Sequence, residues 1–411
     1  MNKRKWTRGE KGLVGVPALL FAAVGLVLWR QVSVPPTIRL PDAETNHPSN
    51  DPVVRSLDFS PDGRRLVVVY WNNSSNFQNA IFDTRTCVQV GALQFPTAFP
   101  DTRLDWSPDG SRIVGAYNMG GGRVKTKAGT TKFNSKFSFN VAMWSAATCN
   151  LMWTAPYAPA PQDSAVSQLR FSADGRVIVG EGRPLALLDA ATGAQLGLAA
   201  SHFKSAGWSW LNRDRTLLAQ NNGDATQIQV REARTGRVLW NPKVGRAGIF
   251  YWSPSDVLAI SDFHGTNDRR LLLWDGQTRR PLPAPPTRHA ARFIVNPRKP
   301  WVAISEITYA GADGQTAQSS SLWVWNYATQ KTVWRTPMRS FVFCSWSPDG
   351  RYLASAETEN AEHEATLRIF DAKGALQREL YEDAVDFLVW APDSKQLAVA
   401  GENQIQIVRV D

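Results

Sequence analysis

One four-residue turn recurs along this 411-residue chain, and its spacing limits the folds that the chain can adopt. In the clearest copies, proline presets φ, aspartate accepts backbone N–H groups within the turn, and glycine takes the left-handed position that follows. The clear copies begin at Ser60, Ser107, Ser172, Ser253, Ser347 and Ala391, and weaker copies begin at Asn212 and Asn296. Successive copies lie 40 to 65 residues apart, which indicates eight repeats of one structural unit.

Each unit is predicted to contain four short antiparallel strands. An alternating segment such as Leu57-Asp58-Phe59 precedes each turn, and a run such as Arg65–Val69, which is rich in β-branched residues, follows it. A third strand ends in sequences such as Leu273-Trp274-Asp275, and a threonine turn such as Thr235-Gly236 leads to a fourth strand. A four-stranded repeat of about 45 residues is typical of a propeller blade. The sequence therefore predicts an all-β protein, an eight-bladed β-propeller spanning residues 37–411.

The last unit needs a strand from elsewhere in the chain. Residues 387–410 provide only three strands, which would leave an open sheet edge. Residues 37–40 (Thr-Ile-Arg-Leu) precede the first unit and are predicted to be the outer strand of the last one, paired with residues 404–410.

The repeated unit resembles the WD-repeat and related quinoprotein-like propeller families. The Ser-Pro-Asp-Gly turns and Trp274-Asp275 are similar to the former, and Glu232-x-x-Thr235-Gly236-x-x-x-Trp240 is similar to the tryptophan-docking motif of the latter. The Gly-His pair that WD repeats place before the first strand is absent, and Ser201-His202 is the nearest match. Because these motifs are structural, the resemblance implies a fold and no particular activity. The metal-ligand and adjacent-cysteine features that a quinone cofactor would need are not found, and no cofactor is predicted.

The N-terminal residues are predicted to form a membrane anchor. Residues 12–29 carry no charge and would form a helix of about 27 Å, close to the thickness of a bilayer core. We assign residues 1–30 as cytoplasmic tail and transmembrane helix and residues 31–36 as a linker. A cleaved signal peptide is the alternative, although no Ala-x-Ala-like site follows. The apolar anchor residues include Leu13, Val14, Leu19, Leu20, Phe21, Leu26, Leu28 and Trp29.

The distribution of charge indicates topology rather than nucleic-acid binding. The net charge is +10, of which +5 lies in residues 1–30 and +5 in residues 118–139, so the remainder is neutral. Five cations precede the apolar segment, which keeps the start cytoplasmic and sends the propeller to the extracytoplasmic or periplasmic side of the cell membrane. The six linker residues reach about 20 Å, which places the face carrying the turns near the membrane. We expect no nucleic-acid partner.

The connections between the second and third strands should share the opposite face and bind a protein partner. The second unit offers a basic arm, Arg123, Lys125, Lys127, Lys132 and Lys136, interleaved with Phe133 and Phe137. The fifth unit offers Arg269 and Arg270, and the seventh an acidic arm, Glu357, Glu359, Glu362 and Glu364. Glu359, Glu362, Glu364 and His363 could ligate a divalent ion, but their spacing fixes no geometry, and we predict an exposed acidic loop without metal.

No set of residues predicts catalysis. Cys87, Cys149 and Cys344 match neither a disulfide pair nor a metal pattern, and the first two are expected to replace a turn glycine. The sequence favours a membrane-anchored, non-catalytic interaction scaffold or an accessory subunit of a larger membrane assembly. Two alternatives stay open: a propeller enzyme, such as a quinoprotein-like oxidoreductase, a lyase or a hydrolase, with its site at the central channel, and a module that recognises glycan or cell wall.

Overall fold

The described part of the chain consists of strands and connecting segments, without a helix. The structure, a computed structural model, describes residues 35–40, 52–72, 76–95, 104–118, 123–125, 131–133, 139–157, 165–183, 185–199, 206–265, 268–287, 289–310, 316–339, 342–358, 365–382, 385–401 and 404–410. Within these ranges the chain is all-β, as the repeat pattern predicts.

The strands form four-stranded antiparallel sheets that follow the sequence repeats. The first three units contain β2 (Val53–Phe59), β3 (Arg65–Asn72), β4 (Asn76–Asp83) and β5 (Gln89–Gly91); β6 (Asp105–Trp106), β7 (Arg112–Asn118), β10 (Phe139–Ser145) and β11 (Leu151–Pro156); and β12 (Ala165–Phe171), β13 (Val177–Arg183), β14 (Leu185–Asp189) and β15 (Gln195–Ala199). The next two contain β16 (Ala206–Leu211), β17 (Leu217–Asn222), β18 (Ile228–Glu232) and β19 (Val238–Trp240); and β20 (Arg246–Trp252), β21 (Val257–Phe263), β22 (Arg269–Asp275) and β23 (Arg280–Leu282).

The remaining units contain β24 (Ala290–Val295), β25 (Trp301–Ala310), β26 (Thr316–Asn326) and β27 (Lys331–Met338); β28 (Val342–Trp346), β29 (Tyr352–Thr358), β30 (Ala365–Asp371) and β31 (Leu376–Glu382); and β32 (Phe387–Trp390), β33 (Gln396–Ala400), β34 (Gln404–Arg409) and β1 (Thr37–Arg39). A single bridge between Gly182 and Ser209 joins the third and fourth units into one eight-stranded sheet. A separate two-stranded hairpin, β8 (Arg123–Lys125) with β9 (Thr131–Phe133), lies in the connection between β7 and β10.

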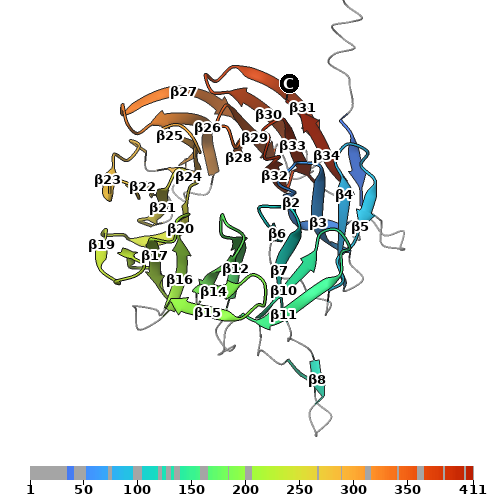
Figure 1. Ribbon diagram of the computed structural model, residues 1–411. Coiled ribbons are helices and arrows are strands. Elements are labelled where there is room, and N and C mark those ends of the chain that lie inside the picture. The colour runs from blue at the N-terminus through green and yellow to red at the C-terminus, as the bar shows by residue number, and fades with distance from the viewer. Residues whose placement is uncertain are drawn as a thin grey trace, which may run out of the picture. The chain divides into compact units, whose positions relative to one another are not determined.

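Within Pro36–Asp411 the sheets are arranged as a closed ring (Figure 1). The first strand of each unit contacts the preceding unit, and β2 of the first unit contacts β32 of the last. This is the arrangement of a β-propeller. The connections between second and third strands leave the ring on one face, here called the loop face, and the serine and threonine turns lie on the opposite turn face.

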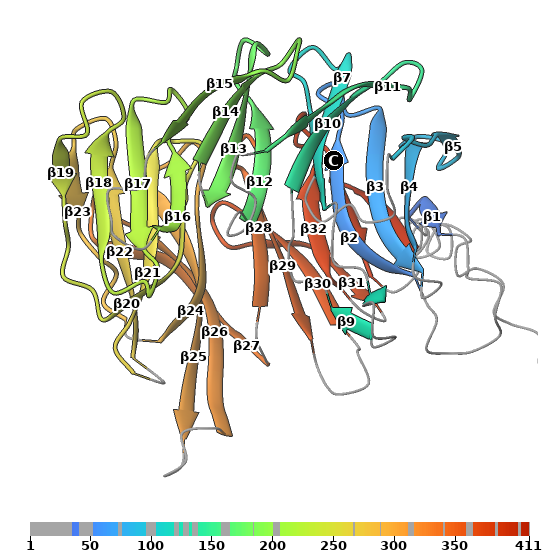
Figure 2. The same cartoon turned by 90° about the horizontal axis from the view of Figure 1, so that it is seen from below.

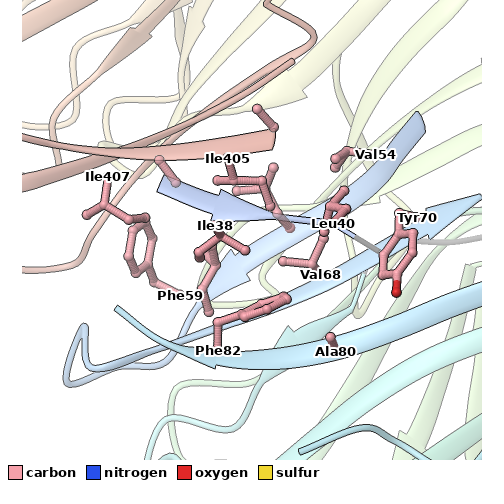
Figure 3. Packing of buried hydrophobic residues seen from close by; sticks show 14 of the residues in the cluster. Ile38, Leu40, Val54, Phe59, Val68, Tyr70, Ala80, Phe82, Ile405 and Ile407 are labelled. Atoms are coloured by element: carbon pink, nitrogen blue, oxygen red, sulfur yellow. The ribbon is translucent and has the colours of Figure 1, made fainter. Parts of the chain in front are cut away.

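A strand from the N-terminal side completes the last sheet. β1 pairs antiparallel with β34, with Thr37 opposite Gln406, Ile38 opposite Ile405 and Arg39 opposite Gln404. Ile38 and Leu40 are buried in a cluster that contains Ile405 and Ile407 of the last unit and Phe59 and Phe82 of the first (Figure 3). The pairing joins the two ends of the ring, and it is the pairing expected for residues 37–40.

Local hydrogen bonds explain why the turn signature recurs. Ser60 Oγ donates to Asp62 Oδ1 at 2.6 Å and accepts the Arg65 N–H at 2.9 Å. The Gly63 backbone adopts φ 69°, which L side chains rarely take. The serine and aspartate side chains form the same bond at Ser107–Asp109, Ser172–Asp174 and Ser347–Asp349. Hydrogen bonds from Ser107 and Ser111 lower the pKa of Asp109 to about 2.

The cysteines occupy the expected turn positions. Cys87 and Cys149 have φ 57° and 60°, and Gly193 and Gly236 have φ 74° and 71° in the equivalent threonine turns. Both cysteines therefore stand where the backbone favours glycine. Cys344 lies on β28, and all three thiols are free.

The predicted membrane anchor is outside the described residues, as is all of the linker except residues 35 and 36. No helix in the described ranges is long and apolar enough to span a membrane. The chain divides into two compact units, Met1–Pro35 and Pro36–Asp411.

Candidate functional site

The basic arm of the second unit contains a β-hairpin where the sequence predicted only a loop. In the β8–β9 pairing, Arg123 lies opposite Phe133, Val124 opposite Lys132, and Lys125 opposite Thr131. β9 is on the loop face, the side toward which β25 and β26 extend (Figure 2). Lys127, Lys136 and Phe137 lie outside the described residues, as do Glu359, Glu362, His363 and Glu364 of the acidic arm.

The two arginines predicted in the fifth unit begin strand β22. Arg270 forms a two-pronged ion pair with Asp268, at 2.8 and 3.1 Å, and its hydrogen bond to that carboxylate raises the pKa of Arg270. The Arg269 guanidinium lies over the Phe263 ring, 5.4 Å from its centroid. Each arginine is thus held by an interaction with its own unit, and their contact with a partner stays a prediction.

Glu357 differs from the sequence-based expectation of an exposed acidic arm. It lies near the end of β29, is fully buried, and forms an ion pair with Arg368. Its Oε2 also accepts the Arg339 N–H at 2.9 Å. Burying a carboxylate requires such partners, because desolvation otherwise costs several kcal/mol. Glu357 is therefore a structural residue here and offers no charge at the surface.

Equivalent buried carboxylates occur in two neighbouring units. Asp262 on β21 and Glu306 on β25 match Glu357, since each lies five residues after the first pair of the common cross-strand register. Asp262 pairs with His264 at 2.7 Å, and Glu306 pairs with Arg335 at 2.7 Å. A position-by-position comparison of the repeats would have revealed this shared acid, which the sequence analysis missed.

Each of these three carboxylates accepts a hydrogen bond from the segment that leads into its own unit on the loop face. Asp262 accepts the Gly245 N–H at 2.8 Å, Glu306 accepts the Thr287 hydroxyl, and Glu357 accepts the Arg339 N–H. All three donors belong to connections that lead from the preceding unit. The acids therefore hold the unit-to-unit connections, which gives them a structural use rather than a role as free acids or bases.

The first strand of every unit has a partly exposed residue at the same position, two residues before the turn begins, and these residues are called the inner wall. These residues are Asp58, Asp105, Arg170, Trp210, Tyr251, Ile294, Ser345 and Val389. Several bind the backbone of the next unit: Asp105 accepts the Phe171 N–H at 2.7 Å, Tyr251 accepts the Val295 N–H at 2.7 Å, and Arg170 donates to the Leu211 carbonyl at 2.8 Å. The wall thus joins neighbouring units.

Two acids have raised pKa values: Asp105 of this wall, and Glu181 of β13, which pairs with Arg170 of the wall. Burial raises the pKa of Asp105 to about 6, against the opposing effects of the Phe171 N–H and Arg170. Burial also raises the pKa of Glu181, although this acid forms a 3.0 Å ion pair with Arg170. A perturbed acid in a channel is what the enzyme alternative requires. Here both carboxyl groups contact neighbouring units, and the described residues contain no cluster of three or more metal-ligating side chains.

Comparison with known proteins supports the fold. The WD domain, G-beta repeat family matches residues 43–75, which cover part of the first unit. The β-propeller domain of Myceliophteria thermophila Cps50 (Swd1) matches 92% of this chain and 100% of its own length, with 14% identity and a TM-score of 0.48. Because this similarity to a solved structure is low, the assignment of the fold rests on the four-stranded sheets and on the closure of the ring. No curated protein sequence matches the chain. The four-stranded sheets and the closed ring define a β-propeller, and residues 43–75 are similar to a WD repeat.

Proposed function

We propose that this chain is a membrane-anchored, eight-bladed β-propeller that acts as a non-catalytic scaffold or accessory subunit of a membrane-associated complex. Eight copies of the turn and the closure of the last sheet by β1 support the count of eight blades. The chain would cross the membrane once, with its start in the cytoplasm and its propeller on the extracytoplasmic side.

An extended hairpin on the loop face carries the scaffold proposal. β25 and β26 are 10 and 11 residues long, and their pairing continues to Ala310 opposite Thr316. The flanking strands end earlier, since β24 pairs no further than Glu306 and β27 no further than Ser320. The hairpin therefore extends beyond its own sheet (Figure 2). A rigid ring with a projecting hairpin suits partner binding better than small-molecule chemistry.

The direction of β1 supports the proposed orientation at the membrane. β34 runs away from the loop face, because it follows the connection between the second and third strands of its unit. β1 is antiparallel to it, so the chain reaches the ring from the turn face. A short linker to residues 12–29 would accordingly hold the turn face near the bilayer and leave the loop face accessible.

The scaffold proposal is tested by replacing residues 308–319 with Asn-Gly. Ile307 and Ser320 are cross-strand partners, so a two-residue turn can join them without disturbing the sheet. The full-length variant and the wild type are purified in mild detergent, and partners that co-purify are identified. We expect the variant to lose a partner while its thermal midpoint stays unchanged. Recovery of the wild type as a lone monomer, or equal partner recovery by both, would contradict the proposal.

The anchor is tested separately by alkaline extraction of membranes and by the mass of the mature N-terminus. We expect the full-length chain to stay in the membrane fraction and a chain lacking residues 1–30 to be released. A mature chain that begins after residue 30 would instead identify a cleaved signal peptide.

A further inference from the structure

The two weaker copies of the turn each place an arginine at the same end of the inner wall. In the turn that begins at Asn212, Arg213 stands where most copies have proline. In the turn that begins at Asn296, Arg298 stands where most copies have aspartate. Both arginines are exposed, and neither side chain has a hydrogen bond or ion pair with the described residues. Departures from the repeat have therefore introduced two unpaired cations.

Asparagine compensates for the lost turn residues. Asn296 Oδ1 accepts the N–H groups of Arg298 and Lys299 at 2.9 Å each, so this turn is held by the side chain of its first residue. Asn212 Oδ1 accepts the Leu217 N–H at 2.8 Å, as the serine oxygen does elsewhere. The turn at Asn212 keeps the regular left-handed fourth residue, with Arg215 at φ 66°, whereas the turn at Asn296 is held by the Asn296 side chain. Within the described part of the chain, the side chain of neither Arg213 nor Arg298 forms a hydrogen bond that holds its turn.

Two adjoining hollows lie beside these arginines, with volumes of 310 and 370 Å³. Arg213, Tyr251, Trp252 and Pro254 line both of them. Arg298 lines only the second, together with Trp346 and other residues of the sixth and seventh units. The two hollows adjoin at these four shared residues and are together called the groove, which is lined by residues from the third unit to the seventh.

The groove carries an uncompensated positive charge. Arg170 and Glu181 line the first hollow, but they neutralise each other in a 3.0 Å ion pair. Among the described residues, Arg213 and Arg298 are the other charged ones that line the two hollows. The floor between them is formed by tryptophan, tyrosine and proline side chains, which offer apolar surface to a ligand. Arginine and aromatic residues together are characteristic of the strongest contacts in protein interfaces.

From this arrangement we propose that the groove binds an acidic peptide segment of a partner protein. The turns of Arg213 and Arg298 belong to the fourth and sixth units, and the fifth unit lies between them. Both arginines line the second hollow, and an extended peptide can present successive carboxylates to them. Each guanidinium can bind a carboxylate through two parallel hydrogen bonds, and the aliphatic stems of the peptide would lie on the aromatic floor. This site is on the face opposite the extended hairpin, and it goes beyond the proposed function.

The probe is a peptide that alternates glutamate and valine, with blocked ends, and its matched control has glutamine in place of glutamate. Binding to the full-length chain in a non-ionic detergent is followed by tryptophan fluorescence, since Trp210, Trp252 and Trp346 line the groove. We expect Arg213→Gln and Arg298→Gln each to weaken binding about fivefold and the double variant to weaken it about 20-fold. Binding should also weaken as salt is added, because the cations are exposed.

The matched protein control is Arg64→Gln. Arg64 is exposed in a regular turn of the first unit, so this change removes the same charge away from the groove. It should leave binding unchanged. Equal weakening by Arg64→Gln, no binding by the wild type at low salt, or binding of the glutamine peptide with equal affinity would overturn the proposal. Tighter binding of a single-stranded oligonucleotide of equal charge would show that the groove binds nucleic acid rather than an acidic peptide. None of these outcomes depends on the partners recovered through the loop face.

Discussion

Replacing Ile38 with alanine tests whether the short strand β1 holds the ring closed. Ile38 is 1% exposed and packs with Ile405, Ile407 and Phe59, which come from the two ends of the ring. Removing three buried carbon atoms loses their transfer free energy and leaves a cavity that the sheets fill only in part. Large-to-small changes of this kind cost about 2–5 kcal/mol.

The assay is thermal unfolding of the full-length protein, followed by circular dichroism and tryptophan fluorescence. For a fold of this size the expected loss lowers the midpoint by about 3–6 °C. Arg39→Ala is the matched control, because Arg39 belongs to the same strand and has its side chain exposed. We also expect the Ile38→Ala variant to aggregate more readily, since loosening β1 exposes the edge of β34. An unchanged midpoint for Ile38→Ala, or a shift no larger than that of Arg39→Ala, would refute the closing role of β1.

Three further predictions concern buried or strained residues. Glu357→Ala should lower the free energy of unfolding by about 3 kcal/mol, and the thermal midpoint with it, because the change leaves Arg368 without its buried partner. Glu379→Ala removes the more exposed partner of Arg368 and should have a much smaller effect on the midpoint. The pKa of Asp105 is raised to about 6 in the folded protein, so ionisation destabilises the fold as pH rises from about 4 to above 6. Asp105→Asn should therefore raise the free energy of unfolding by about 1–3 kcal/mol relative to wild type at pH 8, and by little or nothing at pH 4. Urea unfolding at pH 4 and pH 8 measures this difference, and its absence would show that the Asp105 carboxyl is solvated. Cys87→Gly and Cys149→Gly should each raise stability by about 0.5–1 kcal/mol, because a left-handed backbone strains any residue with a Cβ; a lower thermal midpoint would show that the thiols contribute packing instead.

The repeat could be read from the sequence because its defining interactions are local. The bonds of Ser60 with Asp62 and Arg65 span five residues or fewer, so the same few residue types reproduce the turn wherever they occur. Strand alternation is local as well, and the missing fourth strand of the last unit followed from counting. For these reasons the all-β fold, the four-stranded units and the role of residues 37–40 could be predicted.

The environment of the candidate site residues could not be predicted in this way. Glu357 lies near the end of a strand and beside an acidic stretch, and this sequence context predicts an exposed side chain. In the structure, however, it contacts the Arg339 N–H and the Arg368 side chain and is buried. Asp105 reads as an ordinary strand residue, but the neighbouring unit buries it and raises its pKa to about 6. Burial in both cases depends on chain segments from outside the local sequence.

The sequence by itself determined the repeated unit, its turns, the free cysteines at left-handed positions and the expectation of an N-terminal anchor. Only the tertiary structure decided which side chains meet across units, because closing the ring brings together residues from separate repeats. Arg213 and Arg298 are 85 positions apart and appear in sequence as imperfect turns. Ring geometry places both beside Tyr251 and Trp252, and two irregular copies of the turn line one hollow with positive charge.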